Sequence, residues 1–253
     1  MKPLLARFKY IFSVQLLALS FASCSLNASH TPAKEIPIAW HPGFTMQELL
    51  ASPGNPIVHP SELPHLITAS WYAEINVTAT KTGETTFASC KDYFEKAGKL
   101  TRTIKDNEMS AYIEFAIMCD ATKLFLEAES SETTFLPDDI LNANTPKIWP
   151  KKIAFQISPD ESRRKSLNPK LTTWADITPL LKYEKKSETK SIYYLTGGYQ
   201  EIDIIGRGDS NNDGVEDIFV ISRDYVEGGN YFNMRLFVLS VSEKGNWDLI
   251  SSI

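Results

Sequence analysis

The chain has 253 residues, of which 43% are hydrophobic and 11% aromatic, and its formal net charge is −5. This length and composition suffice for one large domain or two small ones with a buried core. The acidic balance argues against a nucleic-acid partner, because binding phosphates requires clustered Lys and Arg, and the short basic runs here are interleaved with acids.

The N-terminus has the layout of a secretory signal peptide. Lys2, Arg7 and Lys9 precede an apolar run over residues 10–22, and small residues follow. The run is shorter than the roughly 20 apolar residues that span a bilayer, and a buried core helix rarely begins behind three basic residues. We therefore expect residues 1–23 to be a leader. Its removal takes the formal net charge from −5 to −8.

Residues 21–24 resemble a bacterial lipobox, in which a cysteine becomes acylated and forms the new N-terminus. The resemblance implies that Cys24 carries lipid and that the chain is an exported, periplasmic lipoprotein. Ser25 then implies a location in the outer membrane, because lipoproteins of Gram-negative bacteria are usually sent there when the residue after the acylated cysteine is not Asp. Phe21 departs from the preferred Leu, Val or Ile, so ordinary cleavage after Ala22 stays open.

The next segments have little periodicity and then mixed structure. Residues 24–65 are rich in Pro and His and predict a tether or irregular arm. Residues 66–190 predict an α+β region. Within it, β-branched and aromatic residues over 66–80 favour one or two strands, and alternation over 152–158 predicts another strand.

Two helices in this region each carry a cysteine. Apolar spacing predicts helices over residues 89–97 and 110–128, the second capped by Ser110. Cys90 and Cys119 lie on the apolar faces, and an even pair of cysteines in an exported chain favours a disulfide. Two unpaired buried thiols are the alternative.

Residues 191–253 predict an antiparallel sheet, either as a separate unit or as one domain with 66–190. The complete expectation is an α+β fold in which a disulfide-linked helix pair is followed by this sheet, and the sheet carries a metal loop. The expected strands cover residues 192–196, 199–205, 218–222, 231–240 and 247–250. The first two form a hairpin with Gly197-Gly198 as its turn.

An acidic loop precedes the third of these strands. Oxygen ligands at alternate positions are supplied by the side chains of Asp209, Asn211, Asp213 and Asp217 and by the carbonyl of Val215. Calcium takes 6–8 oxygen ligands, and alternate spacing in a tight loop turns them inward. Gly214 permits the sharp turn. The pattern predicts calcium as a cofactor, with an Asp- and Asn-rich surface turn as the alternative.

The loop is not an EF-hand, because Val220 stands where the bidentate carboxylate is needed and a strand follows. It resembles the calcium loops of FG-GAP and VCBS repeats, in which Asp-x-Asn-x-Asp-Gly-x-x-Asp leads into an apolar strand. Those loops recur in every propeller blade, whereas this one occurs once. The layout also resembles a group of exported proteobacterial proteins with a Cys-bearing helix pair, one such loop and a Gly-Gly hairpin, here Gly228-Gly229. That resemblance implies no particular activity.

No nucleophile elbow, phosphate loop or dinucleotide-binding motif is present. Three functions remain open. The first is a non-catalytic, calcium-binding envelope module that meets another envelope protein or a glycan. The second is a periplasmic inhibitor or immunity-type partner of a secreted enzyme. The third is a hydrolase with dispersed catalytic residues.

Overall fold

The computed structural model describes residues 35–41, 47–54, 60–156, 160, 163, 167–229 and 231–253. Lys34–Ile253 form one compact unit. Helices combined with two antiparallel sheets confirm the α+β class. The predicted leader 1–23, Cys24 and the start of the arm lie outside the described residues.

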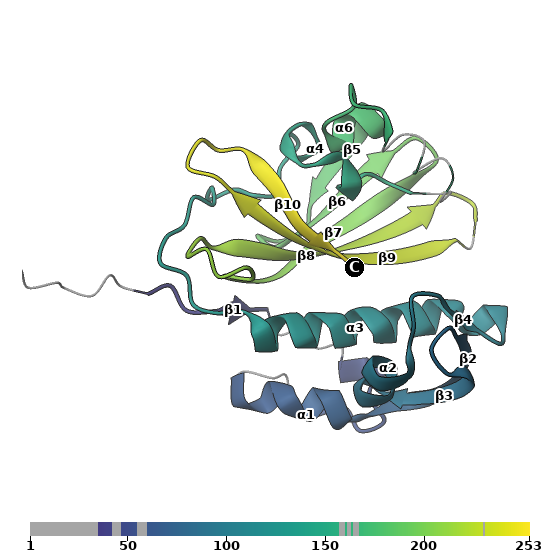
Figure 1. Cartoon of the computed structure of the whole chain (residues 1–253). Helices are drawn as coiled ribbons and strands as arrows, with labels where there is room; N and C mark the ends of the chain where they lie inside the picture. Colours follow the sequence, from purple (N-terminus) through teal and green to yellow (C-terminus); the bar gives the residue numbers. More distant parts are fainter. Residues whose placement is uncertain are drawn as a thin grey trace, which may run out of the picture. The chain divides into compact units, whose positions relative to one another are not determined.

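The larger sheet is antiparallel and has the strand order β10-β9-β8-β7-β6-β5 (Figure 1). Its strands are β5 (Leu180–Lys185), β6 (Lys190–Leu195), β7 (Gly198–Gly208), β8 (Asp217–Val226), β9 (Phe232–Val241) and β10 (Trp247–Ser252). The strands expected within 191–253 are all present. The sheet also includes β5, which precedes that region, and β1 (Ala39–Trp40) from the arm, which pairs with β7 beyond the end of β6.

The smaller sheet has the order β3-β2-β4. Its strands are β2 (Ser70–Ala79), β3 (Gly83–Ser89) and β4 (Thr101–Thr103). The helical elements of the described chain are η2 (Gln47–Leu49), η3 (Pro60–Glu62), α1 (Leu63–Thr68), α2 (Cys90–Lys96), η4 (Asp106–Glu108), α3 (Met109–Glu127), α4 (Thr145–Ile148), η5 (Lys151–Ile153) and α6 (Trp174–Ile177). The expectation of strand over 66–80 is therefore wrong for its first residues, which belong to α1. Pro64 lies in the first turn of this helix, where a missing N–H is tolerated.

The two faces of the larger sheet are buried by different parts of the chain. On β8, Phe219 and Ile221 join a core with α3, whereas Ile218 and Val220 join a core with α6 on the opposite face. Figure 1 shows α3 along one side of the sheet and α4 and α6 on the other. Burial on both faces explains why β8 reads as a continuous apolar run rather than an alternating one.

Helix α3 confirms the predicted helix over 110–128, but Ser110 does not cap it. The helix begins at Met109, directly after the η4 turn, and its N-cap residue Glu108 makes no side-chain capping bond. The preceding 3-10 turn continues into the helix, so a Ser at the second helical position cannot act as the cap.

Along its length α3 joins the two sheets. Near its start the Phe115 ring stacks on Trp71 of β2, with ring centroids 4.1 Å apart. Near its end the Phe125 ring meets Phe219 of β8 edge-on at 5.0 Å. Both phenylalanine side chains are buried, so α3 packs against both sheets in the same core.

The predicted disulfide between α2 and α3 is confirmed. Cys90 and Cys119 are bonded and fully buried, with 5.2 Å between their Cα atoms. Helix α2 starts where expected, because the Ser89 side chain accepts a hydrogen bond from the backbone N–H of Asp92.

The hairpin between β6 and β7 turns one residue earlier than predicted. Leu195 pairs with Gly198, so the turn is Thr196-Gly197 and not Gly197-Gly198. Gly197 has a φ of 85°, which favours glycine. Gly198 belongs to the strand, where an added Cβ would lie 2.1 Å from the Tyr225 carbonyl oxygen.

The strand predicted over residues 152–158 is wrong for its described part. Residues 151–153 form the η5 turn, and no strand follows up to residue 156. Ile153, Ala154 and Phe155 are buried in succession. A half-buried strand would instead alternate buried and exposed side chains, so this segment is held by contacts on several sides.

Candidate functional site

The acidic loop connects β7 to β8, and the last residue of β7, Gly208, pairs with the first residue of β8, Asp217. Two residues in it have positive φ, Asn212 at 60° and Gly214 at 80°. Gly214 tolerates this conformation because it has no Cβ, and Asn is one of the few other residues that adopts it. The loop is therefore wound tightly between the two strands.

Asp209 is the centre of the loop and is only 3% exposed. Its Oδ1 accepts hydrogen bonds from the backbone N–H groups of Asn211, Asn212 and Asp213, the shortest being 2.7 Å from Asn212. Its Oδ2 accepts from the N–H of Gly214 at 2.7 Å. The carboxylate thus accepts hydrogen bonds from successive backbone amides of the loop, which surround it.

Asp217 closes the loop from the first position of β8 and is fully buried. Its Oδ2 accepts from the backbone N–H of Ser210 at 3.1 Å and from the Ser210 hydroxyl at 2.5 Å. Its Oδ1 is buried without a hydrogen-bond partner among the described residues. Burial raises the pKa of Asp217, while the Ser210 and Ser240 hydroxyls favour the ionised form and the Asp213 charge opposes it.

Asn211, Asp213 and Val215 complete the predicted ligand set on the exposed side of the loop. The Asn211 amide nitrogen donates to Asp213 Oδ2 at 2.9 Å, and the Val215 N–H donates to Asp213 Oδ1 at 2.8 Å. The five residues are therefore gathered in one loop. Across the part of the chain that the structure describes, however, no three His, Cys, Asp or Glu side chains are grouped as metal ligands.

A neighbouring segment, residues 129–133, covers the loop through backbone contacts. Asp209 bridges to Glu129, and Val215 bridges to Thr133. The Gly214 carbonyl accepts from the N–H groups of Glu132 and Thr133 at 2.8 and 3.0 Å. The loop is consequently part of the folded unit, not a projection from it.

A second polar cluster lies inside the core, on the face of the larger sheet covered by α6. We call Gln200, Ser222, Asp224 and Arg235 the buried clamp. The Arg235 guanidinium pairs with Asp224 Oδ2 at 2.8 Å, and both Gln200 and Ser222 donate to Asp224 Oδ1. Burial raises the pKa of Asp224, and the Arg235 charge opposes that rise.

The clamp holds residues 152–154, which lie in the segment that the sequence predicts to be a strand. Arg235 donates to the carbonyl oxygens of Lys152, Ile153 and Ala154 at 2.9 to 3.2 Å, and Gln200 donates to Ile153 at 2.9 Å. Because Arg235 and Gln200 both donate to backbone carbonyls of this segment, we interpret the clamp as structural. In the sequence, the sign of this clamp is that polar residues stand at alternate positions of an otherwise apolar strand.

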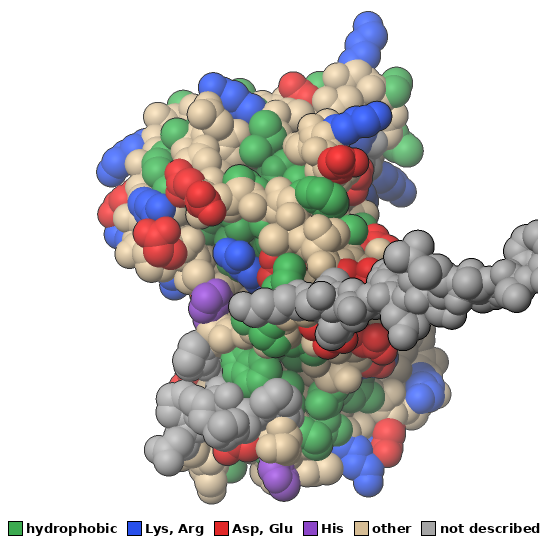
Figure 2. Space-filling model, turned by 90° about the vertical axis from the view of Figure 1, so that its left-hand side faces the viewer, with side chains coloured by type: hydrophobic (Ala, Val, Ile, Leu, Met, Phe, Trp, Pro, Cys, Tyr) green, Lys and Arg blue, Asp and Glu red, His purple; other side chains and the backbone are tan. Residues whose placement is uncertain are grey.

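Two further predictions concern the membrane and the surface. Cys24, the expected lipidation site, lies outside the described residues. Among the helices that the structure describes, none is long and apolar enough to cross a membrane. On the face drawn in Figure 2, acidic and basic side chains are interspersed and do not form separate blocks.

Comparison of the sequence with protein-family models, with curated proteins and with solved structures found no match.

Proposed function

We propose that this chain is a non-catalytic, calcium-binding protein of the bacterial cell envelope that acts as an interaction module. The observation that carries the proposal is the loop from Asp209 to Asp217. Three of its five proposed ligands carry carboxylates, and one buried carboxylate oxygen, Asp217 Oδ1, has no hydrogen-bond partner among the described residues. A buried acceptor without a partner costs about 1–3 kcal/mol, and a cation would satisfy it.

The ligand chemistry fits a hard cation. Asp209, Asn211, Asp213 and Asp217 offer side-chain oxygens and Val215 a carbonyl oxygen, and no nitrogen or sulfur ligand is included. A bound calcium ion would supply the positive charge that offsets repulsion among the three carboxylates. The exposed pair, Asn211 and Asp213, would exchange their mutual hydrogen bond for the ion.

The location of the loop suggests what the ion would stabilise. The segment that covers the loop also pairs with the arm, since Ile36 and Ser131 exchange backbone hydrogen bonds of 2.8 and 2.9 Å. Strand β1 then joins the arm to β7 at Gly206 and Arg207. Calcium would therefore strengthen the part of the fold from which the arm departs.

A melting experiment tests the ion. At tenfold above its dissociation constant a ligand stabilises the folded chain by about 1.4 kcal/mol, which for a chain of this size raises Tm by about 4 °C. Asp213→Ala should abolish the rise, because it removes a central carboxylate. Magnesium should give a smaller rise, since it releases its waters reluctantly.

The matched control is Asp138→Ala, which removes an exposed acid outside the loop. This variant should keep the full calcium-dependent rise. Equal melting curves with and without millimolar calcium for the unsubstituted chain would contradict the proposal.

The envelope location has its own test. If Cys24 is acylated, cells given radiolabelled palmitate should label the unsubstituted chain, and Cys24→Ser should lose both the label and membrane association. Export without label would favour cleavage after Ala22 and a chain free in the periplasm.

A further inference from the structure

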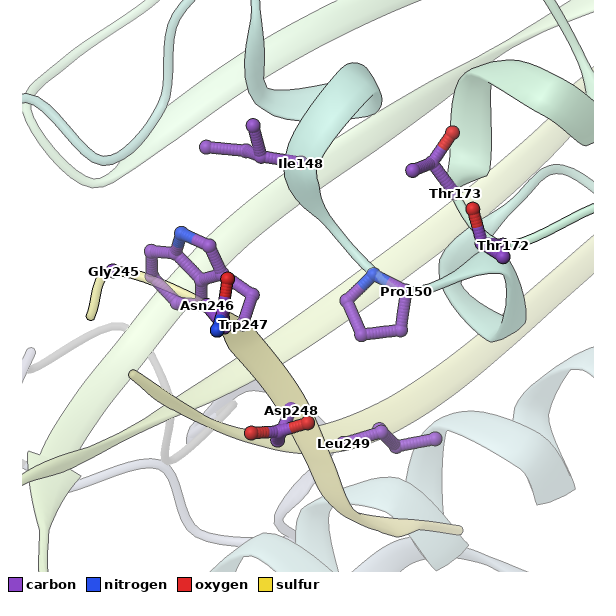
Figure 3. A pocket seen from close by; sticks show the side chains of 9 residues that line it. All are labelled: Ile148, Pro150, Thr172, Thr173, Gly245, Asn246, Trp247, Asp248 and Leu249. Atoms are coloured by element: carbon purple, nitrogen blue, oxygen red, sulfur yellow. The ribbon is translucent and has the colours of Figure 1, made fainter. Parts of the chain in front are cut away.

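A groove runs beside β10, the last strand of the larger sheet. Its volume is about 440 Å³, within the range of about 300–1,000 Å³ typical of ligand sites. It is lined by Ile148, Pro150, Thr172 and Thr173 on one side and by residues 245–249 on the other (Figure 3).

The groove follows the edge of the strand. Trp247, Asp248 and Leu249 are consecutive residues of β10 and all line it, whereas successive side chains of a strand point to opposite faces. A cavity that touches every one of them must border the backbone edge. Strand β9 occupies the other edge of β10, so the groove lies along the edge that no described strand pairs with.

The residues on the other side of the groove do not pair with this edge of β10. Pro150 forms a β-bridge with Thr173, and the Lys151 N–H donates to the Thr172 carbonyl at 3.0 Å. The two segments that form this wall therefore pair with each other. Among the described residues, no backbone hydrogen bond joins either segment to β10. Half of the backbone groups on an edge strand point outward, and here they point toward the groove.

The two end strands of the sheet differ in how they resist pairing. Strand β5 carries Lys182, Glu184 and Lys185, and charged side chains discourage edge-to-edge contact. Strand β10 has a single charge, Asp248. The pairing of β10 with β9 shifts register between Leu249 and Ser251, so the residues that line the groove, 247–249, belong to one continuous stretch of pairing.

The groove also offers apolar contacts. Ile148 is 47% exposed although it is a large hydrophobic residue, and Figure 3 shows it across the groove from Trp247, with Pro150 on the same wall as Ile148. An extended chain would satisfy the edge of β10 with its backbone and place alternate side chains against these residues.

We propose that this groove binds an extended peptide segment of a partner protein, which adds to β10 as a further strand. This proposal builds on the interaction role proposed above and names its class of partner, a protein with an extended segment. It involves no residue of the calcium loop, so the two proposals fail independently.

Selection from a phage library of random dodecapeptides on the whole chain tests this proposal, with a separate, parallel selection on Ile148→Arg as background. The enriched peptides, once synthesised, should bind the unsubstituted chain and bind Ile148→Arg about tenfold or more weakly, a loss of about 1.4 kcal/mol. Leu181→Arg is the control, because Leu181 is equally apolar and 67% exposed on β5 at the opposite edge. That variant and Asp213→Ala should bind as the unsubstituted chain does. Hydrogen exchange should slow at residues 247–249.

Three outcomes would overturn the proposal. The selection enriches no peptide above the Ile148→Arg background, or the peptides bind Ile148→Arg undiminished. Alternatively, sedimentation shows that the chain pairs with a second copy through this edge, in which case Ile148→Arg makes it monomeric and the occupant is the chain itself.

Discussion

Asp120 lies next to the disulfide in an environment that disfavours its charge. Its Oδ2 accepts a hydrogen bond from the Tyr93 hydroxyl at 2.9 Å. Burial raises the pKa of Asp120 to about 6, although Tyr93 and Lys123 favour the ionised form. A raised pKa in the folded state means that the chain loses stability as pH rises from about 4 to 6.

Replacing this carboxyl by an amide should remove the loss. Asp120→Asn keeps an acceptor for Tyr93 and should stabilise the chain at pH 8 by at most about 3 kcal/mol, with no gain at pH 4, where the native carboxyl is already neutral in the folded chain. Urea unfolding at both pH values measures the difference. The same gain at pH 4 and pH 8 would show that the effect is not electrostatic.

At the scale of elements, the disulfide is the strongest single constraint between α2 and α3. The bonded residues are separated by 29 positions, and closing a loop of that length stabilises by about 3.5 kcal/mol in the chain-entropy model. Replacing both cysteines by alanine should therefore lower Tm by about 10 °C. A melting curve that the double replacement leaves unchanged would mean that packing alone holds the helices.

Elements with one buried face were predictable from the sequence. In α3 and in the hairpin of β6 and β7, the apolar period identifies both the element and its buried side. The turn of that hairpin was misplaced by one residue, because the close approach of Tyr225 to Gly198 is a tertiary contact that no local pattern records.

Segments held from several sides were not predictable. Residues 151–156 look like a strand, but the buried clamp takes their carbonyls, and Arg235 is more than 80 residues away in the sequence. Strand β5 was missed because its charged side chains hide its period. The groove beside β10 combines three distant segments and has no sequence signal apart from Trp247.

The candidate metal loop shows the same limit. The spacing predicts which five residues share the loop, but it does not reveal how their oxygens are used. In the structure Asp209 is committed to backbone amides, and only Asp217 retains a buried oxygen without a donor.

At the scale of the whole molecule, the loop, the covering segment and the arm form one connected region. Calcium should therefore slow hydrogen exchange not only in residues 209–217 but also in the backbone of Ile36 and Ser131, which pair with each other beside the loop. Protection confined to the loop would mean that the ion acts locally and leaves the arm unaffected.

The proposal that this chain binds calcium is tested most directly by isothermal titration calorimetry of the whole chain. We expect one ion per chain with a dissociation constant of about 10⁻⁴ to 10⁻³ M, the range of extracellular calcium modules, and we expect Asp213→Ala to show no binding while Asp138→Ala binds normally. No heat of binding to the unsubstituted chain at millimolar calcium, or equal binding by Asp213→Ala, would contradict the proposal and leave the loop as an acidic turn held by its own hydrogen bonds.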